Sequence, residues 1–378
     1  MSTIKANAIL DASGGNTVTI NSVTPTAYNT MGKNLIINGA MEIAQRGTSF
    51  TSLTNAYTLD RMRVYRNGNH DFTVTQESDA PSGSGFQKSI KIQTTTADAT
   101  LDSADYSIFQ YNIEGKDLQQ LAYGSSGAKS KTLSFWVKSN MTGNLSVTSE
   151  VNTGPPFLSG YVTINAADTW EYKTITYVGN TSTTIDNDNT TGIELQFWLS
   201  AGSGISGGTY NNTSWNSDAN SRVNPTNQIN IQNSTSNYIQ FTGLQLEAGS
   251  VATEFERRPY GMELALCQRY YEKSYDYATA PGTATFLGAE WFYNLSSANM
   301  TQTGGKVTYK VPKRITTATF TPYSPNTGTS GKFYTNSSGD VSPNYGNAGG
   351  ETGIACYGAF TATINGQTWL HWTSSAEL

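Results

Sequence analysis

The sequence predicts an all-β protein built around a jelly-roll-like β-sandwich. Short segments that alternate between apolar and polar residues recur along the chain, and clusters of Gly, Asn, Asp, Ser and Pro separate them. Aromatic residues make up 11% of the chain and include 22 Tyr, a residue type that β-strands favour. At least eight such segments lie in the central region, which is typical of one sandwich or jelly roll.

The first 37 residues are expected to form a short β arm of their own. Residues 4–10 and 17–21 alternate in polarity on either side of a Ser-Gly-Gly-Asn turn, which is the pattern of a hairpin. Two strands cannot bury a core without a partner surface. We therefore interpret residues 1–37 as an attachment arm, with a disordered leader as the alternative.

Residues 38–258 hold the predicted sandwich. A helical interruption is expected at Gly115–Tyr123, where apolar residues have helical spacing. Residues 201–230 contain few core candidates, and a run of this length without structure is usually either functional or disordered. The strand candidates lie at residues 58–65, 72–76, 89–93, 106–113, 131–138, 160–164, 172–178, 192–199 and 238–246.

One helix, predicted over about residues 259–273, separates the sandwich from a second, smaller β domain within residues 259–378. Pro259 opens the helix, and apolar residues then recur at spacings of three and four, as one buried face requires. We expect this helix to be buried between the domains or near a threefold axis. Strand candidates follow at residues 286–293, 305–311, 317–323, 331–335, 354–364 and 368–372.

Composition argues against two classes of partner. Charged residues are only 13% of the chain and the net charge is −5, so no basic surface for a nucleic acid is evident. No segment approaches the roughly 20 apolar residues of a membrane span, so membrane insertion is not expected. Residues 1–10 lack the apolar core of a secretory signal, and secretion by that route is not expected either.

Catalytic motifs are nearly absent, and we expect no enzymatic activity. His70 and His371 are the two histidines, and neither accompanies a nucleophile-elbow or metalloprotease motif. Cys267 and Cys356 are the two cysteines; both are expected to be buried structural thiols. Glycoside hydrolysis needs only two carboxylates, which leaves a depolymerase as an alternative. Candidates for such a pair are Asp60, Asp71, Asp102, Asp105, Glu194 and Glu290.

One acidic cluster is a candidate metal site. Asp186 and Asp188 lie in an Asp-Asn-Asp-Asn run whose oxygen atoms would suit calcium. The run lacks the twelve-residue pattern of an EF-hand loop, so a plain polar turn is the favoured interpretation. No other cofactor is expected.

Four aromatic residues are candidate ligand contacts. Trp136 and Trp198 occupy polar-parity positions of two strands, and together they could form a platform on which a sugar stacks. The alternative is that a subunit or the helix covers both. Tyr210 and Trp215 lie on the long polar loop and are predicted to contact either a receptor or another subunit.

Two adjacent arginines precede the helix. Arg257 and Arg258 are expected to pair with acids such as Glu254, Glu256 or Glu263. Exposed ion pairs contribute little free energy, so we expect these pairs to fix the geometry of the domain junction.

Five segments resemble a family of tailed-phage virion proteins described as tail fibre, tail or receptor-binding proteins. They are TIKANAILDASGGNTVTINSVTP, KNLIINGAMEIAQRGTSF, the pair KTLSFWVKS and FTGLQLEAGSVATEFERRPYGMELALCQRYYE, and the closing HWTSSAEL. They are spread over almost the whole chain in this order. None has the chemical specificity of a catalytic motif.

The resemblance implies a virion component, usually a homotrimer, with a carbohydrate-module-like β-sandwich. We expect a tail fibre or receptor-binding protein that adheres to a host-surface glycan and joins other tail or capsid proteins through residues 1–37. Its location would be the virion, after synthesis in the host cytoplasm. The alternatives are a purely structural tail adaptor or capsid decoration or spike, and a polysaccharide depolymerase.

Overall fold

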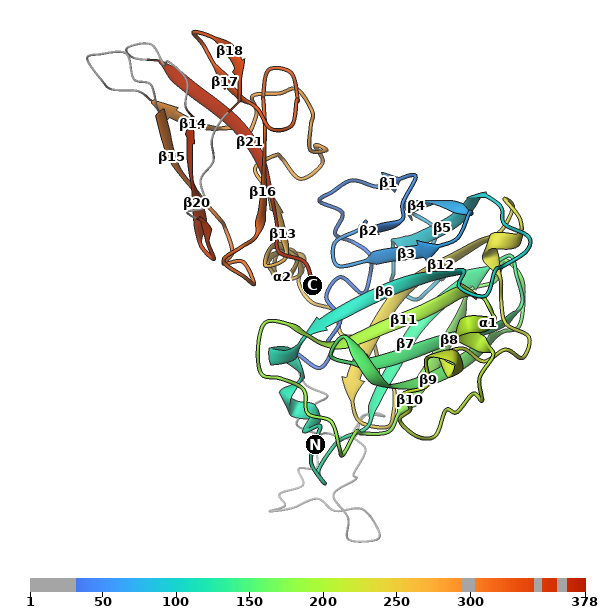
Figure 1. Cartoon of the computed structure of the whole chain (residues 1–378). Helices are drawn as coiled ribbons and strands as arrows, with labels where there is room; N and C mark the ends of the chain where they lie inside the picture. Colours follow the sequence, from blue (N-terminus) through green and yellow to red (C-terminus); the bar gives the residue numbers. More distant parts are fainter. Residues whose placement is uncertain (1–31, 294–302, 343–348, 359–365) are drawn as a thin grey trace, which may run out of the picture.

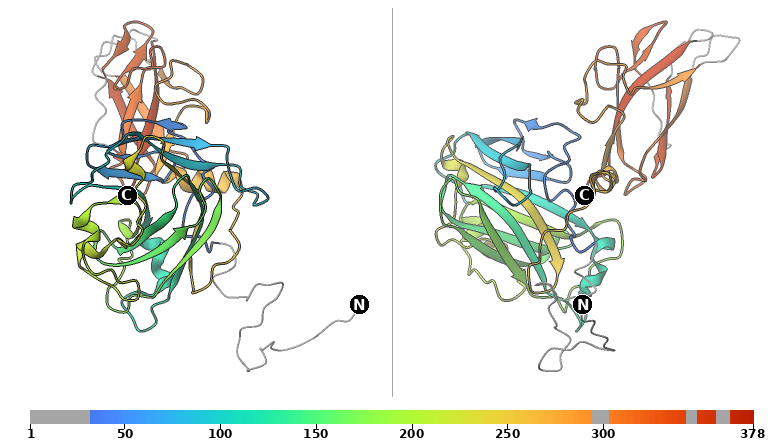
Figure 2. Two further views of the ribbon diagram at one scale, coloured as in Figure 1. Left: turned by 90° about the vertical axis from the view of Figure 1, so that its right-hand side faces the viewer. Right: turned by 180° about the vertical axis from the view of Figure 1, so that it is seen from behind.

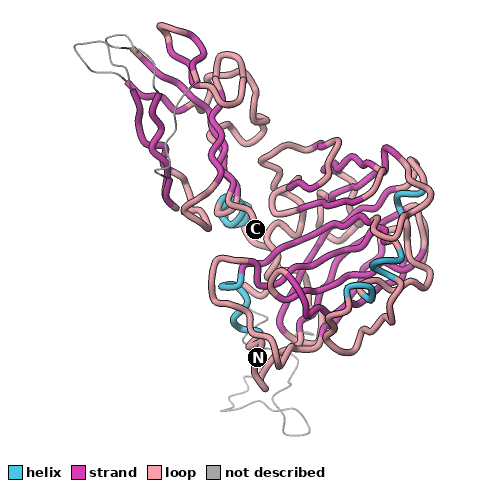
Figure 3. Tube along the Cα trace, viewed as in Figure 1, coloured by secondary structure: helices cyan, strands magenta, loops and turns pink. Residues whose placement is uncertain are grey.

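Figure 1 shows the computed structural model of the chain, which describes residues 32–293, 303–342, 349–358 and 366–378. Strands dominate both of its units, a two-sheet sandwich and a smaller C-terminal domain (Figure 3). The prediction of an all-β protein with a jelly-roll-like sandwich is confirmed. Residues 1–31 of the predicted arm lie outside the described residues. Among the described residues, no helix has the length and apolar character needed to cross a membrane.

The sandwich consists of two six-stranded antiparallel sheets. The first sheet has the order β1 (Ser49–Phe50), β4 (Asp71–Glu77), β5 (Ser89–Thr96), β12 (Tyr238–Ala248), β7 (Lys131–Ser139), β10 (Glu171–Tyr177). The second has the order β2 (Asn55–Tyr57), β3 (Arg63–Asn67), β6 (Tyr106–Glu114), β11 (Thr191–Ala201), β8 (Gly143–Val151), β9 (Gly154–Ile164). The hairpins β2–β3, β4–β5 and β8–β9 each stay within one sheet, and the other connections cross from one sheet to the other, as in a jelly roll.

Alternation along the strands produces the core. In β7 and β11, every second side chain points inward, and the rings of Phe135 and Phe197 meet with centroids 5.2 Å apart. Phe109 and Phe241 stack beside them at 5.1 Å. Burial of large aromatic side chains of this kind supplies much of the free energy that holds two sheets together.

Hydrogen bonds join the segment before β1 to β12. The Asn34 side chain donates to the Leu244 carbonyl (3.1 Å) and accepts from the Leu246 amide (3.1 Å), while the Leu35 amide donates to the Leu246 carbonyl (2.9 Å). Gly39 approaches β12 so closely that a Cβ atom would lie 2.1 Å from the Leu244 oxygen. Leu35 belongs to the sandwich core, so the sandwich extends to residues before the predicted boundary at 38.

Two predicted irregular regions have defined structure. The helical interruption is a 3₁₀ helix, η1 (Gly115–Leu121). The loop at residues 201–230 packs on the second sheet and contains α1 (Ser203–Ser206) and η2 (Ala219–Ser221), while η3 (Ile231–Asn233) follows it. The expectation of few core residues in the loop is corrected at Val223 and Ile229, which are fully buried.

The junction helix is shorter than predicted. Helix α2 covers Tyr260–Gln268, and the chain then enters strand β13 (Tyr271–Lys273). The helix ends early because residues 271–273 pair with residues 373–375, a distant partner that local spacing does not reveal. Its burial is partial: Cys267 is fully buried, whereas Met262 is exposed.

The C-terminal domain is organised around β21 (Gln367–Ser375). Strands β13 and β16 (Thr319–Tyr323) flank one end of β21, and β14 (Glu290–Tyr293) and β17 (Phe333–Thr335) pair with its other end. Strand β18 (Gly339–Val341) extends this sheet beyond β17. A second sheet has the order β15 (Thr303–Thr308), β20 (Gly353–Gly358), β19 (Gly349–Gly350). The predicted second β domain is therefore present.

The two units meet at α2 and the C-terminus (Figures 1 and 2). At their centre lies Arg61, only 1% exposed, whose guanidinium contacts the Glu377 carboxylate and the Asn112 carbonyl and covers the Tyr270 ring at 3.7 Å. Burial disfavours its charge, but the Glu377 carboxylate raises the pKa of Arg61 above its usual value. The junction thus contains a charge that is stable only while both units are in contact.

Further ion pairs surround this charge. Arg46 binds the other oxygen of Glu377 at 2.9 Å. Arg269 makes two hydrogen bonds to Glu114 at the end of β6 (2.6 and 3.1 Å). Arg314 donates to the carbonyl groups of residues 376 and 377 (2.8 and 2.9 Å). The last three residues of the chain are therefore part of the junction rather than a free tail.

Replacement of Glu377 by Ala should destabilise the protein strongly. The Arg61 charge would stay buried without its carboxylate, and the loss of one partner from a buried pair costs about 3–5 kcal/mol. Urea unfolding followed by tryptophan fluorescence measures the change. Glu254→Ala, at an exposed carboxylate, is the matched control and should change the free energy of unfolding by less than about 0.5 kcal/mol. Equal stability of the two variants would contradict this account of the junction.

Candidate functional site

A groove of about 370 Å³ crosses the outer face of the second sheet. It runs over β3, β6 and β11, and the loop that carries α1 and η2 closes one side. We call it the sheet groove and define it by the side chains that matter chemically: Arg63, Tyr65, Tyr106, Gln110, Glu194 and Arg222.

The groove follows from strand alternation and register. In β11, Leu195 and Phe197 point into the core, which places Glu194 and Gln196 on the outer face. Register pairs Gln196 with Gln110 of β6 and Gln110 with Arg63 of β3. Directly paired residues on neighbouring antiparallel strands share a face, so this polar row crosses three strands.

Aromatic rings form one wall of the groove. Tyr65 and Tyr106 meet edge-on with centroids 5.4 Å apart, and Tyr106 meets Trp198 in the same way at 5.9 Å. Trp198 is 4% exposed, and its Nε1 donates to the Thr148 hydroxyl (2.9 Å). Burial raises the pKa of Tyr106, so its hydroxyl stays protonated near neutral pH. The two tyrosines, rather than the tryptophan, present ring surface to the groove.

Charged groups form the opposite wall. Glu194 lies directly across from Glu150 of β8. Arg222 holds Glu150 with two hydrogen bonds (2.7 and 2.9 Å), while the Gln196 amide donates to Glu194. Burial, together with repulsion from Glu150, raises the pKa of Glu194. The groove therefore combines half-buried rings with amide, guanidinium and carboxylate groups, a set that suits a polyhydroxylated ring compound.

The predicted pairing of Trp136 with Trp198 is corrected. Trp136 lies on β7 of the first sheet and Trp198 on β11 of the second, so their outward side chains occupy opposite faces of the sandwich. Trp136 instead lines a depression of about 650 Å³ beside Tyr172, whose ring lies 5.4 Å away and is 46% exposed. Sheet membership depends on long-range pairing, so parity alone could not separate the two tryptophans.

Tyr210 and Trp215 both have contacts within the chain. The Tyr210 hydroxyl donates to the Ser159 carbonyl (3.2 Å). The Trp215 ring lies 4.9 Å from Nζ of Lys131, a fully buried lysine whose pKa burial lowers to about 7. The indole Nε1 donates to the Val178 carbonyl (3.2 Å). Trp215 therefore covers one end of the sandwich core, and ligand contact by either residue stays a prediction.

The acidic run behaves as a polar turn. One oxygen of Asp188 accepts hydrogen bonds from the amide and hydroxyl of Thr190 (2.8 and 2.6 Å), and Asp186 is exposed. Asn189 bonds to the Arg314 carbonyl (2.7 Å), which ties this turn to the C-terminal domain. Within the described ranges, no three His, Cys, Asp or Glu side chains are grouped as a metal site would need.

Both histidines are buried and inaccessible. His70 Nε2 lies 2.7 Å from the Ser107 hydroxyl, the spacing of a nucleophile and its base, but both residues have no exposed surface. His371 stacks on Tyr275 with centroids 3.7 Å apart. A substrate could not reach the Ser107–His70 pair, which therefore belongs to the core. Both cysteines are free and buried, as predicted.

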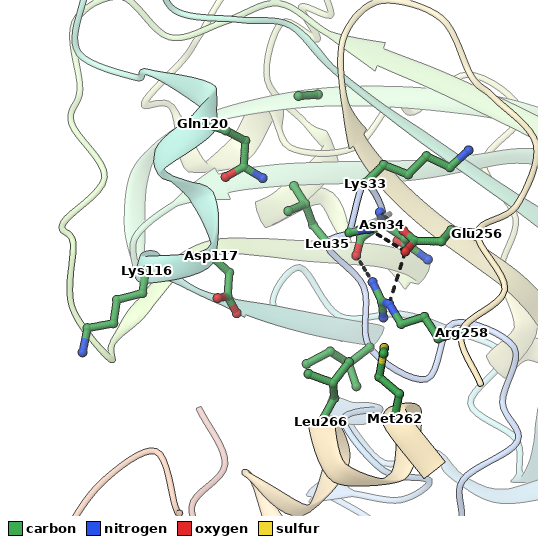
Figure 4. A pocket seen from close by; sticks show the side chains of 13 residues that line it. Lys33, Asn34, Leu35, Lys116, Asp117, Gln120, Glu256, Arg258, Met262 and Leu266 are labelled. Carbon is green, nitrogen blue, oxygen red and sulfur yellow. Dashed lines mark hydrogen bonds and ion pairs between the residues drawn. The ribbon is translucent and has the colours of Figure 1, made fainter. Parts of the chain in front are cut away.

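A second pocket, of about 560 Å³, lies where the described chain begins (Figure 4). Lys116, Asp117 and Gln120 line it from η1. Opposite them, Arg258 approaches Glu256 at 3.7 Å, and Glu256 also accepts from the Asn34 amide (2.6 Å). Arg258 and Glu256 thus hold the segment before β1 in place.

The predicted arginine pairing is confirmed for Arg258, which also contacts Glu263 at 3.4 Å. Arg257 instead covers the Phe86 ring at 4.6 Å and donates to the Ser84 carbonyl (2.8 Å).

Sequence reasoning placed Glu194 and Trp198 on the correct parity but missed Tyr65 and Tyr106. A signal was present, because Val64 is a core residue and the neighbouring Tyr65 must then point outward. What the sequence lacked was the pairing of β3 with β6, which brings the two rings together.

The fold and groove define an all-β chain with a recessed surface site. No protein-family model matches the chain, and no curated protein matches it. Similar solved structures include the enzymatically active domain of bacteriophage CBA120 tailspike protein 4 (12% identity, 57% of this chain, 21% of that chain, TM-score 0.30).

Two carbohydrate-binding modules are also similar. One is the family 11 module of Clostridium thermocellum (13% identity, 55% of this chain, 98% of that chain, TM-score 0.27). The other is the CBM22-1 xylan-binding domain from Paenibacillus barcinonensis (11% identity, 58% and 97%, TM-score 0.26). The fold is defined here by the order of the strands in the two sheets, and the site is defined by the groove.

Acidification should destabilise the protein through the two histidines. Burial lowers the pKa of His70 and of His371 from 6.5 to about 4. The unfolded chain therefore takes up these protons first, so the stabilisation is complete above pH 6.5 and is lost as the pH falls toward 4. A shift of this size corresponds to at most about 3 kcal/mol for each ring, before screening by solvent reduces it.

Urea unfolding at pH 7, 5.5 and 4.5 measures this effect. The His70→Gln variant, which keeps a hydrogen-bonding side chain, should lose less stability between pH 7 and 4.5 than the unsubstituted protein. An identical pH dependence in both proteins would exclude His70 as a source of acid sensitivity.

Proposed function

We propose that this chain is a phage virion protein, a tail fibre or receptor-binding protein, that binds a host-surface glycan through the sheet groove without catalysis. The observation that carries the proposal is the groove itself, where the Tyr65 and Tyr106 rings face amide and charged groups across β3, β6 and β11. The C–H face of a sugar stacks on aromatic rings, and its hydroxyl groups bond to amides and carboxylates. Small-molecule sites combine apolar surface with a few placed polar groups in this way.

The virion role rests on the sequence resemblance, which covers residues 3–25 and 33–50, β7, the junction and the C-terminus. A homotrimer would present three grooves, and repetition raises avidity without any new contact. Attachment to other virion proteins would use residues 1–37. A structural adaptor or decoration protein would share these features without needing the groove.

The carboxylates of the groove favour binding over hydrolysis. Glu194 is the one acidic residue lining it among the described residues. Glu150, its neighbour on β8, is 5% exposed and held by Arg222. Hydrolysis of a glycosidic bond requires two accessible carboxylic groups on either side of it. A depolymerase is therefore the alternative function that the binding experiment must exclude.

The double variant Tyr65→Ala/Tyr106→Ala should bind polysaccharide about tenfold more weakly, because both rings of the groove wall are lost. Binding of the full chain to an array of bacterial surface polysaccharides measures this loss. Tyr260→Ala is the control, because this tyrosine is 52% exposed on α2, outside the sheet groove, and its loss should leave binding unchanged.

Two results would assign another function. Release of reducing sugar that Glu194→Gln abolishes would make the protein a depolymerase. Absence of binding by the purified protein, when the complete virion does bind the same polysaccharide, would assign a structural role.

A further inference from the structure

An aromatic row crosses the C-terminal domain. Register pairs Trp291 of β14 with Trp369 of β21, Trp369 with Tyr334 of β17, and Tyr334 with Asp340 of β18. Directly paired residues share one face of a sheet, so three rings and one carboxylate follow each other across four strands. We use the term aromatic row for these four residues. Strands lie about 4.8 Å apart, which makes the row about 14 Å long.

The row is accessible. Trp291 is 52% exposed, and its ring stacks beside that of Trp369 with centroids 5.9 Å apart and planes inclined by 30°. Phe286, itself 44% exposed, stands edge-on against both Trp369 and Tyr334 at 5.7 and 5.4 Å. The two indole rings thus stack against each other, and Phe286 stands edge-on beside Trp369 and Tyr334. In Figure 1 the strands of the row lie at the end of the C-terminal domain away from the sandwich.

The core does not account for this arrangement. Phe292, the neighbour of Trp291, packs against the hydrophobic cluster that contains Phe333, Leu370 and Trp372. Strand β14 therefore already contributes its inward side chain to the core, and Trp291 points away from it. Large exposed aromatic groups that gather on one face usually mark an interaction site.

The chemistry of the row selects the class of partner. The one charge of the row is the Asp340 carboxylate, which accepts hydrogen bonds from the hydroxyl groups of Ser324 (2.5 Å) and Thr327. Lys332, on the same face just before β17, donates instead to the Ser342 hydroxyl (2.7 Å). An anionic lipid surface or an acidic partner would be repelled by this carboxylate and by the net charge of −5. An apolar protein surface would bury Asp340 while its partners are hydroxyl groups and not a cation, which is costly.

A neutral glycan meets neither obstacle. Its ring faces stack on the indoles, and its hydroxyl groups donate to the carboxylate. We propose that the aromatic row is a second glycan-binding site, specific for an uncharged oligosaccharide, which stacks on Trp291 and Trp369 and donates a hydroxyl hydrogen bond to Asp340. This inference shares its ligand class with the proposed function but depends on a different domain. Two sites on one chain would raise avidity for one polysaccharide strand or engage two different glycans.

Affinity electrophoresis of the full chain through gels that contain a neutral β-glucan, galactan, mannan or xylan tests the proposal. The groove variant Tyr65→Ala/Tyr106→Ala should still be retarded by at least one of these polysaccharides. Addition of Trp291→Ala should weaken that residual binding about tenfold, as expected for the loss of one anchor. Trp291→Phe keeps a ring and should retain most of the binding.

Leu287→Ala is the matched control, because this side chain is 73% exposed near Phe286 but lies outside the row. Its binding should equal that of the unsubstituted chain. Unfolding curves for all variants confirm that the exposed substitutions leave the fold intact.

The outcomes separate the two sites. If the groove variant loses all retardation and Trp291→Ala alone leaves retardation unchanged, the second site is overturned and the sheet groove stands. If Trp291→Ala alone abolishes retardation and the groove variant is retarded normally, the groove is overturned and the row is supported. Two further results would overturn the row as a glycan site: a smaller oligomer caused by Trp291→Ala in sedimentation experiments, or vesicle binding to phosphatidylcholine that this substitution abolishes.

Discussion

The buried guanidinium of Arg61 is the interaction on which the arrangement of the two domains depends. Arg61 has a positive φ of 70°, which is unfavourable for a residue with a side chain, and its charge is removed from water. These costs are offset by Glu377 near the C-terminus, the Tyr270 ring after α2 and the Asn112 carbonyl of β6. One charge therefore makes three segments, far apart in the sequence, depend on each other.

The strands that leave this junction carry the two candidate surfaces. Strand β6 ends at Glu114, which binds Arg269, and the same strand bears Tyr106 and Gln110 of the sheet groove. Strand β21 is followed by Glu377, which contacts Arg61, and its other end bears Trp369 of the aromatic row. Because a β-strand is stiff along its length, a fixed junction also fixes the position of each surface relative to the other.

At the candidate site, strand alternation predicted the direction of the side chains but not which strands share a sheet. Alternation correctly turned Glu194, Trp198 and Trp136 away from the core, because side-chain direction is a local property of a strand. The same alternation could not show that Trp136 and Trp198 belong to different sheets, nor that the loop with α1 and η2 buries Trp198. Tyr65 and Tyr106 were identified as groove residues only when the pairing of β3 with β6 was known.

The sequence by itself determined the all-β class, most strands, the start of α2 and the buried state of Cys267, because each depends on composition or on short-range spacing. Tertiary structure alone decided which strands share a sheet, where α2 ends and how the polar loop packs. Helix α2 stops at Gln268 because residues 271–273 gain strand partners about one hundred positions later. Arg61 is charged and yet buried for a similar reason, since Glu377, its counter-ion, is its neighbour only in the folded chain.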